Sequence, residues 1–237
     1  METFEQAFKR VRTENTKKRT FANLLGGLSS NYLTYYQTAI NDYNSQNLYS
    51  ALDNINKTIE KSDINDWKHF AFRANVNEDL HRFKEAISDY EKAIDFSTND
   101  INVYALYHQI GFCYLNHGNN NKAIEFYTYS INLKNQHPNN ESNKDIEGMD
   151  MGVLLGVPFK RMYNNRANAY LNLGQLNESL QDCKKSIGYD KNYSNPYLVL
   201  ANIYSKAGQE AKAIEYLKIS AQLGNRNAQL TLKDIGY

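Results

Sequence analysis

The chain has 237 residues, of which 27 are Lys or Arg and 26 are Asp or Glu, so its formal net charge at pH 7 is +1. A nearly neutral chain lacks the concentrated basic surface that neutralises phosphates, so we expect no nucleic-acid partner. No stretch of the sequence approaches the roughly 20 apolar residues that span a bilayer, which argues against a membrane protein.

The remaining composition points to an intracellular helical protein. Cys113 and Cys183 fall at apolar helix positions, too far apart in sequence for a disulfide framework or a zinc site, so we expect two buried thiols. Three prolines in 237 residues suit long, uninterrupted helices. The charged start Met-Glu-Thr-Phe-Glu does not fit a signal peptide, and we expect a cytoplasmic location.

Residues 1–31 are expected to form an amphipathic helix and a linker. One helical face carries an apolar stripe, made of Phe4, Ala7, Phe8 and Val11. The basic cluster at residues 17–19 fits a solvated helix end, and Gly26 and Gly27 interrupt the chain before the next helix.

From residue 32 onward, a small residue recurs in nearly the same frame. Three of the four spacings are close to 34 residues, and one is longer. These small residues are Ala51, Ala86, Ala123, Ser179 and Ala213, and an aromatic residue precedes each one, at Tyr35, Phe70, Tyr107, Tyr163 and Tyr197. A period of this length indicates an array of repeated structural units, whose usual function is to bind something on an extended surface.

The third unit shows the expected structure of one repeat. Its first half has apolar residues or glycine at helical spacing, at Tyr107, Ile110, Gly111 and Tyr114, and Gly118 then ends this helix. A second helix follows, with Ala123, Ile124, Tyr127 and Ile131 on one face. We expect the two backbones to approach closely where Gly111 meets Ala123. Such a helical hairpin cannot bury its apolar face alone and needs a neighbouring unit.

The fourth and fifth units carry the most specific pattern: Tyr163, Ala167, Tyr170 and Gly174, then Tyr197, Leu200, Ala201, Tyr204 and Gly208. Over residues 32–223 the chain resembles the tetratricopeptide repeat family. The second unit departs from the pattern at Asn77 and His81, and the first at Asp42 and Gln46. The resemblance implies an all-α, right-handed α-solenoid of about five helical hairpins, with an N-terminal helix and a C-terminal capping helix.

The expected organisation is therefore an N-terminal helix and linker at 1–31, units 1–3 at 32–137, an inserted loop at 138–159, units 4–5 at 160–223, and a cap at 224–237. In the cap, Gly224 ends one helix and Asn225 starts another. The insert is polar and acidic first and then apolar. We expect its apolar half either to pack as an extra turn leading into the fourth unit or to lie across the groove as a lid.

No catalytic or cofactor-binding pattern is evident. The five histidines show no metal-ligand spacing, and the sequence has no Gly-rich phosphate loop and no serine elbow. We therefore expect no metal, no cofactor and no enzymatic activity. His108 is interpreted as a polar residue of the binding groove rather than a base.

The resemblance implies that the first helices of successive units line a concave, peptide-binding groove. The implied groove residues are Tyr36, Ile40, Lys68, Ala71, Asn75, His108, Phe112, Asn116, Arg161, Asn164, Asn168, Asn172, Asn195, Leu198, Asn202 and Lys206. Asn75, Asn168 and Asn202 occupy equivalent positions, and their amides could bind the backbone of an extended peptide. A general bias toward asparagine in this chain would also explain them.

One known ligand class of the family is not supported. Tetratricopeptide domains that bind acidic chaperone tails need a two-carboxylate clamp of lysine, asparagine and arginine from three units. Asn165 fits the middle unit, but His108, Phe112, Asn195 and Val199 stand where the flanking lysines, asparagine and arginine are required. Without those cations, a terminal carboxylate would be desolvated without compensation.

The sequence thus predicts a non-catalytic adaptor or scaffold that holds a peptide or helix of a partner protein in its groove. The alternative is a regulatory sensor, in which a ligand fills the groove and the 138–159 insert acts as a lid. A nucleic-acid-binding repeat protein is a further alternative, and it predicts binding that falls steeply with salt.

Overall fold

The structure is a computed structural model that describes residues 31–62, 65–97, 103–136, 148–150 and 153–237. Within these ranges the chain forms five pairs of helices followed by a single helix. The pairs are α2 (Asn31–Asn44) with α3 (Leu48–Lys61), α4 (Trp67–Asp79) with α5 (Phe83–Phe96), α6 (Val103–Asn116) with α7 (Asn120–Gln136), α8 (Phe159–Asn172) with α9 (Leu176–Tyr189), and α10 (Asn195–Lys206) with α11 (Glu210–Gln222); α12 (Arg226–Asp234) is the single helix.

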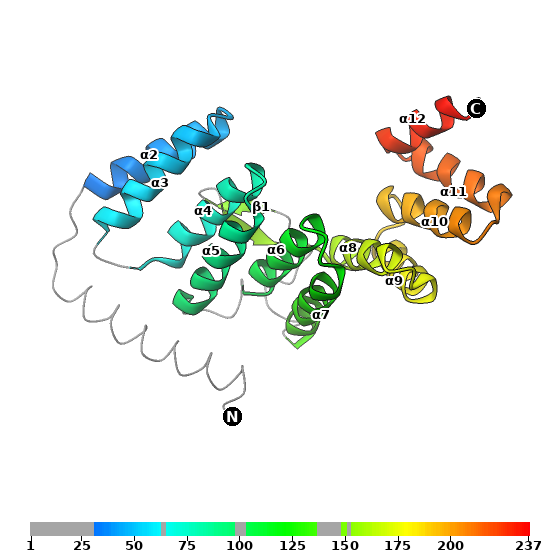
Figure 1. The fold of residues 1–237 in the computed structure, drawn as a ribbon, viewed down its shortest axis with the longest axis horizontal. Coiled ribbons are helices and arrows are strands. Elements are labelled where there is room, and N and C mark those ends of the chain that lie inside the picture. Colours follow the sequence, from blue (N-terminus) through cyan, green and yellow to red (C-terminus); the bar gives the residue numbers. More distant parts are fainter. Residues whose placement is uncertain (1–30, 63–64, 98–102, 137–147, 151–152) are drawn as a thin grey trace.

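The helix pairs, called units 1–5 below, stack one after another into an open arc (Figure 1). The two helices of each unit pack together, and the second helix of each unit packs on the first helix of the next. The predicted all-α solenoid of five helical hairpins is confirmed. The expected N-terminal helix lies outside the described residues. Among the described helices, none has an apolar stretch of the length that a bilayer requires.

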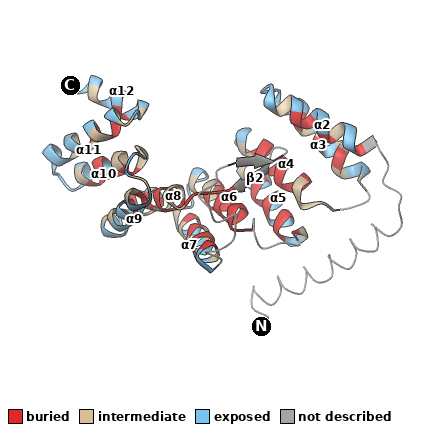
Figure 2. Ribbon diagram, turned by 180° about the vertical axis from the view of Figure 1, so that it is seen from behind, coloured by how far each residue is buried: buried red, intermediate tan, exposed pale blue. Residues whose placement is uncertain are grey.

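The recurring small residues lie where helices meet. Ala51, Ala86, Ala123 and Ser179 are completely buried and Ala213 is half-buried, and every unit contains buried positions (Figure 2). Cys113 and Cys183 are buried free thiols, as predicted. Burial raises the pKa of Cys183 to about 12 and that of Cys113 further, so both act as small apolar side chains at neutral pH.

The predicted C-terminal cap is also present. Gly224 has a φ of 89°, which ends α11, and the Asn225 side chain accepts a hydrogen bond from the backbone N–H of Ala228 to begin α12. Ala228 is completely buried and packs in one cluster with Ala201 and Leu217 of unit 5. The last helix therefore covers part of the apolar face that unit 5 would otherwise expose.

Turns between paired helices need a residue in the left-handed region. Gly118, Gly174 and Gly208 supply it in units 3–5, with φ between 71° and 84°, whereas Gln46 and His81 occupy the same place in units 1 and 2, with φ of 62° and 58°. A side chain with a Cβ is strained in this conformation by about 1–2 kcal/mol. These are two of the family departures noted in the sequence.

We expect Gln46→Gly to raise the free energy of unfolding by about 0.5–1 kcal/mol, because the relief of strain exceeds the extra chain entropy that glycine loses on folding. His81→Gly should gain less stability, because it also removes the edge-on contact between the His81 ring and Phe83. Urea unfolding followed by circular dichroism measures both. Gly174→Ala is the matched control and should be destabilising; a loss of stability in Gln46→Gly would contradict the argument.

The close approach predicted at Gly111 is confirmed. A Cβ at this position would lie 2.9 Å from two ring carbons of Tyr127 and 3.3 Å from the carbonyl oxygen of Ala123. Tyr127 is completely buried, so its ring has little room to move away.

Gly111→Ala should therefore lower the free energy of unfolding by about 1–3 kcal/mol, despite the higher helix propensity of alanine. Gly188→Ala is the matched control, because Gly188 also lies within a helix and a Cβ there would meet nothing within 4 Å. Thermal unfolding of the two variants should shift in opposite directions. A stabilised Gly111→Ala variant would show that the Tyr127 ring adjusts without cost.

Units 2 and 4 each contain an arginine–aspartate pair with a half-buried arginine and a buried aspartate, which no local sequence pattern indicates. In unit 4, Arg166 Nε and Nη2 donate to Asp182 at 2.7 and 2.9 Å, and Nη1 donates to Thr128 Oγ1 of unit 3 at 2.8 Å. In unit 2, Arg73 contacts Asp89 at 2.7 Å through both nitrogens and reaches Asn56 of unit 1 at 2.9 Å. Each guanidinium thus joins both helices of its own unit to the preceding one.

The insert between units 3 and 4, expected to be a loop, contains an antiparallel β-hairpin. Strand β1 (Gly148–Asp150) pairs with β2 (Val153–Gly156), with Met149 opposite Leu154 and Asp150 opposite Val153. Strand β2 lies against α4 and α6. A chain segment that packs on helices must satisfy its backbone hydrogen bonds, and pairing with its own neighbour does so locally.

After the hairpin, the chain is anchored by a buried lysine. Lys134 of α7 is 1% exposed, and its Nζ donates a 2.7 Å hydrogen bond to the carbonyl oxygen of Val157. The ammonium also lies over the rings of Phe159 and Tyr104, at 4.7 and 5.3 Å from their centroids. Val157 itself is completely buried. The end of the insert is therefore part of the packed junction that leads into unit 4.

Candidate functional site

The first helices of the units form the inner side of the arc. Helix α8 packs directly on α6 and on α10, in addition to its contacts with second helices. Direct contact between successive first helices places them on the shorter, inner side of a curved stack. Strand β2 lies against α4 and α6, two of these first helices (Figure 1).

The predicted groove residues differ widely in exposure. Those that are buried are Tyr36, Ile40, Ala71, Asn75, His108 and Asn164; those that are half-buried are Lys68, Phe112, Arg161, Asn168, Asn195 and Leu198; those that are exposed are Asn116, Asn172, Asn202 and Lys206. The exposed residues come from units 3–5. The C-terminal end of the array therefore offers the most accessible of the predicted groove side chains.

Tyr36 illustrates why some predicted residues are buried. Its ring packs edge-on against His69, at 4.7 Å between centroids, and against Phe72 at 5.9 Å. Both partners belong to α4, so Tyr36 contributes to the junction between units 1 and 2. The pattern of unit 1 did not reveal this, because Gln46 stands where units 3–5 have the turn glycine that marks the register.

His108 lies inside the stack between α6, α7 and α8. Its Nε2 is 3.2 Å from Asn165 Nδ2, its Nδ1 is 3.0 Å from Gln109 Oε1, and its ring centroid is 5.2 Å from that of Tyr127. Burial lowers the pKa of His108 to about 4. A neutral imidazole with Nδ1 protonated satisfies both contacts. His108 thus links units 3 and 4.

The three equivalent asparagines have different partners. Asn75 accepts a 2.6 Å hydrogen bond from the Tyr90 hydroxyl, and Asn168 donates a 3.1 Å bond to the carbonyl of Asn164 in its own helix. Asn202 is exposed and lines a cavity. A peptide-binding ladder of all three remains a prediction, and Asn202 is its most accessible member.

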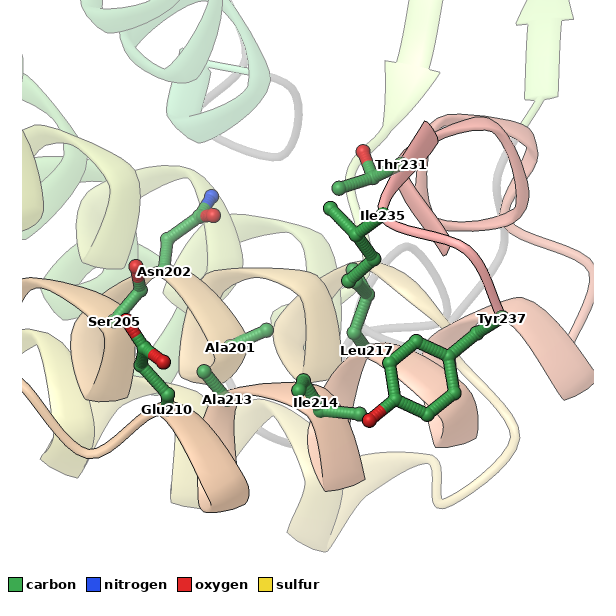
Figure 3. Close-up of a pocket in the computed structure, with 10 residues that line it drawn as sticks. All are labelled: Ala201, Asn202, Ser205, Glu210, Ala213, Ile214, Leu217, Thr231, Ile235 and Tyr237. Carbon is green, nitrogen blue, oxygen red and sulfur yellow. The ribbon is translucent and has the colours of Figure 1, made fainter. Parts of the chain in front are cut away.

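The cavity at Asn202 lies between α10, α11 and the end of the chain (Figure 3). Its volume is about 380 Å³. Asn202, Ser205 and Glu210 form a polar side, and Ala201, Ile214 and Leu217 form an apolar floor, with Thr231, Ile235 and Tyr237 across from the polar side. An apolar floor with a few polar groups at its edge fits the side chain of a bound peptide.

A polar cluster around the half-buried carboxylate of Glu78 lies between α4, α5 and α6. The Glu78 carboxylate accepts hydrogen bonds from the Tyr90 hydroxyl at 2.9 Å, from Gln109 Nε2 at 3.2 Å, and from the Cys113 thiol at 3.6 Å. Burial raises the pKa of Glu78 to about 7, although these three hydrogen bonds lower it. No local sequence pattern indicates this cluster, because its members are separated by 12–35 residues and follow no motif.

The hydrogen bonds of the Tyr90 hydroxyl favour a protonated Glu78. It contacts both Asn75 Oδ1, at 2.6 Å, and Glu78 Oε2, at 2.9 Å, yet it has one proton to donate. A protonated Glu78 can donate to Tyr90, which then donates to Asn75. An ionised Glu78 competes with Asn75 for the same proton.

The described residues contain no group of three or more His, Cys, Asp or Glu side chains suited to hold a metal ion. Lys206, one of the predicted groove cations, donates a 3.3 Å hydrogen bond to the carbonyl of Leu171 at the end of α8. This contact ties α10 to α8 at a carbonyl that also accepts a 3.0 Å hydrogen bond from the backbone N–H of Gly174.

Three segments of the chain, residues 104–137, 160–193 and 194–218, match the family model for the Tetratricopeptide repeat. These segments correspond to units 3, 4 and 5. No curated protein sequence shows a significant match to the chain.

Solved structures provide a comparison of the fold. MamA is similar with a TM-score of 0.61 at 14% identity, covering 84% of this chain and 95% of that one. YrrB, described as a TPR protein with an unusual peptide-binding site, has a TM-score of 0.57 at 17% identity, covering 84% and 90%. PilF of Pseudomonas aeruginosa has a TM-score of 0.61 at 17% identity, covering 84% and 78%. At these identities the likeness concerns the fold alone.

Proposed function

Because this chain belongs to the tetratricopeptide repeat family, we propose that it is a non-catalytic adaptor or scaffold that binds a peptide or helix of a partner protein on its inner face. The repeats and the solved relatives support a protein-interaction module. The cavity at Asn202, between the last unit and α12, is the observation that carries the more specific proposal.

The proposed peptide runs along α8 and α10 and ends at this cavity. Strand β2 already lies against α4 and α6, so the inner face is more accessible at units 4 and 5. There Asn168, Asn172 and Asn202 offer amides for backbone hydrogen bonds, and Leu198 offers apolar contact. One apolar side chain of the peptide would enter the cavity between Ala201 and Leu217.

Peptides selected on the intact chain from a random phage-displayed library test this proposal. Fluorescence anisotropy should show that the selected peptides bind Asn168→Ala/Asn202→Ala about tenfold more weakly, since two hydrogen bonds are lost. Asn177→Ala, an exposed asparagine on the second helix α9, is the matched control and should bind normally. Equal affinity for the double variant and the control would rule out this groove.

A regulatory sensor with a lid is the second candidate, and the position of β2 on α4 and α6 favours it. We propose that the β1–β2 hairpin then competes with a ligand for the inner face. Peptides should therefore be selected anew on a variant in which a short Gly-Ser linker replaces residues 141–155 and the buried Val157 is kept, and they should bind this variant more tightly than the unaltered chain. Unchanged affinity, with the helical circular dichroism intact, would exclude a lid.

A further inference from the structure

A second pocket lies away from the inner face, between the second helices α3 and α5 and the adjoining side of α4. It has a volume of about 440 Å³. Asn77 and Asp89, which are 5% and 4% exposed, lie deepest, and Arg82, Lys84, Glu85, Ser88 and Lys92 form an exposed rim. Leu52, Asn56 and Arg73 complete the lining.

The pocket exists because Asn77 replaces a tyrosine that other units have. The equivalent residues are Tyr114, Tyr170 and Tyr204. In unit 4, which has the same arginine–aspartate pair, the Tyr170 ring lies 5.8 Å from the Arg166 guanidinium and covers it. In unit 2 the shorter Asn77 leaves the corresponding space beside Arg73 open.

The lining of this pocket is positively charged. It contains four cationic side chains, Arg73, Arg82, Lys84 and Lys92, and two acidic ones, Glu85 and Asp89. Asp89 is neutralised by the two hydrogen bonds from Arg73, and Lys92 Nζ lies 3.7 Å from it. An excess of positive charge is thus concentrated at one pocket in a chain whose formal net charge is +1.

We propose that this pocket is a docking site for an acidic segment of a partner protein. A carboxylate of the segment enters the space beside Asn77, and Lys84, Lys92 and Arg82 contact it and its acidic neighbours. An extended partner suits the site, because the rim cations are exposed and each exposed ion pair contributes little alone. This site is separate from the groove, so the two proposals fail independently.

Fluorescein-labelled hexaglutamate is the probe, with anisotropy measured at low and at physiological salt. We expect binding to weaken as salt rises, and Asn77→Tyr to weaken it at least fivefold, because the ring fills the pocket without removing a cation. Lys84→Gln/Lys92→Gln should weaken it about tenfold. Lys185→Gln is the control. Lys185 is the unit 4 equivalent of Lys92, and in unit 4 Tyr170 fills the corresponding space, so this variant should bind hexaglutamate as the unaltered chain does.

Three outcomes would overturn the proposal: no binding of hexaglutamate to the unaltered chain, equal binding by Asn77→Tyr, or an equal loss in Lys185→Gln, which would indicate uniform surface attraction. The double lysine variant alters only exposed side chains, so it tests the site even where Asn77→Tyr fails to fold. Loss of binding in both pocket variants, with Lys185→Gln unaffected, supports the assignment.

Discussion

Replacing Asp182 by alanine should lower the free energy of unfolding by about 3–5 kcal/mol, because it leaves the Arg166 guanidinium buried without its carboxylate. The side chains of Arg166 and Asp182 are 12% and 4% exposed, so water cannot replace the lost partner fully. Urea unfolding followed by circular dichroism measures the loss. Asp53→Ala, which breaks an exposed pair with Lys57, is the control and should cost less than about 1 kcal/mol.

A double replacement tests whether the pair or its burial is responsible. Unit 3 has Ile110 and Phe126 at the positions of Arg166 and Asp182, and it packs without a charge there. Arg166→Ile/Asp182→Phe should therefore recover most of the stability that Asp182→Ala loses, since a well-packed apolar pair replaces a buried ion pair at little cost. A cost below about 1 kcal/mol for Asp182→Ala alone would contradict this account.

The second large effect is a pH dependence centred on Glu78. Its pKa in the folded chain, about 7, lies above the ordinary value of 4.5, so the folded state binds the proton more tightly than the unfolded state. Stability therefore falls as pH rises from about 4.5 to about 7, by about 3 kcal/mol. Glu78→Gln should remove this loss, so it should match the unaltered chain near pH 4 and exceed its stability by about 2–3 kcal/mol at pH 8.

Buried histidines act in the opposite direction. The lowered pKa of His108, about 4, makes stability rise as pH rises toward 6.5, and His69 also has a lowered pKa because of burial. The profile of the unaltered chain is thus a sum of opposed effects. The difference between Glu78→Gln and the unaltered chain isolates the carboxyl, and a difference that does not change between pH 4.5 and 8 would exclude it.

Local patterns were sufficient to predict the helical hairpins. Turn glycines such as Gly174 and small residues such as Ala123 depend on contacts within one unit or with the next, and these contacts repeat along the sequence. The exposure of the groove residues could not be predicted in this way. Asn75 and His108 are buried through contacts with Tyr90 and Asn165, which belong to other helices and appear in no local pattern.

The β1–β2 hairpin likewise could not be predicted from local sequence patterns. Its strands are three and four residues long, and their place on α4 and α6 is set by contacts distant in sequence. The departure at Asn77 was visible in the sequence, but its consequence, a charged pocket, depends on Arg73 and on the rim of α5. Sequence periodicity predicts where units lie and does not predict what replaces a missing side chain.

The hairpin also changes how the array should fold. In a simple repeat protein each unit contacts only its neighbours, so stability is close to a sum of unit and nearest-neighbour energies. Strand β2 precedes unit 4 directly in the chain and lies against α4 of unit 2, which gives this solenoid contacts of high sequence separation. Such contacts form late, after the loop they close. Units 2 and 4 are then energetically coupled across unit 3, and their mutational effects should not be additive.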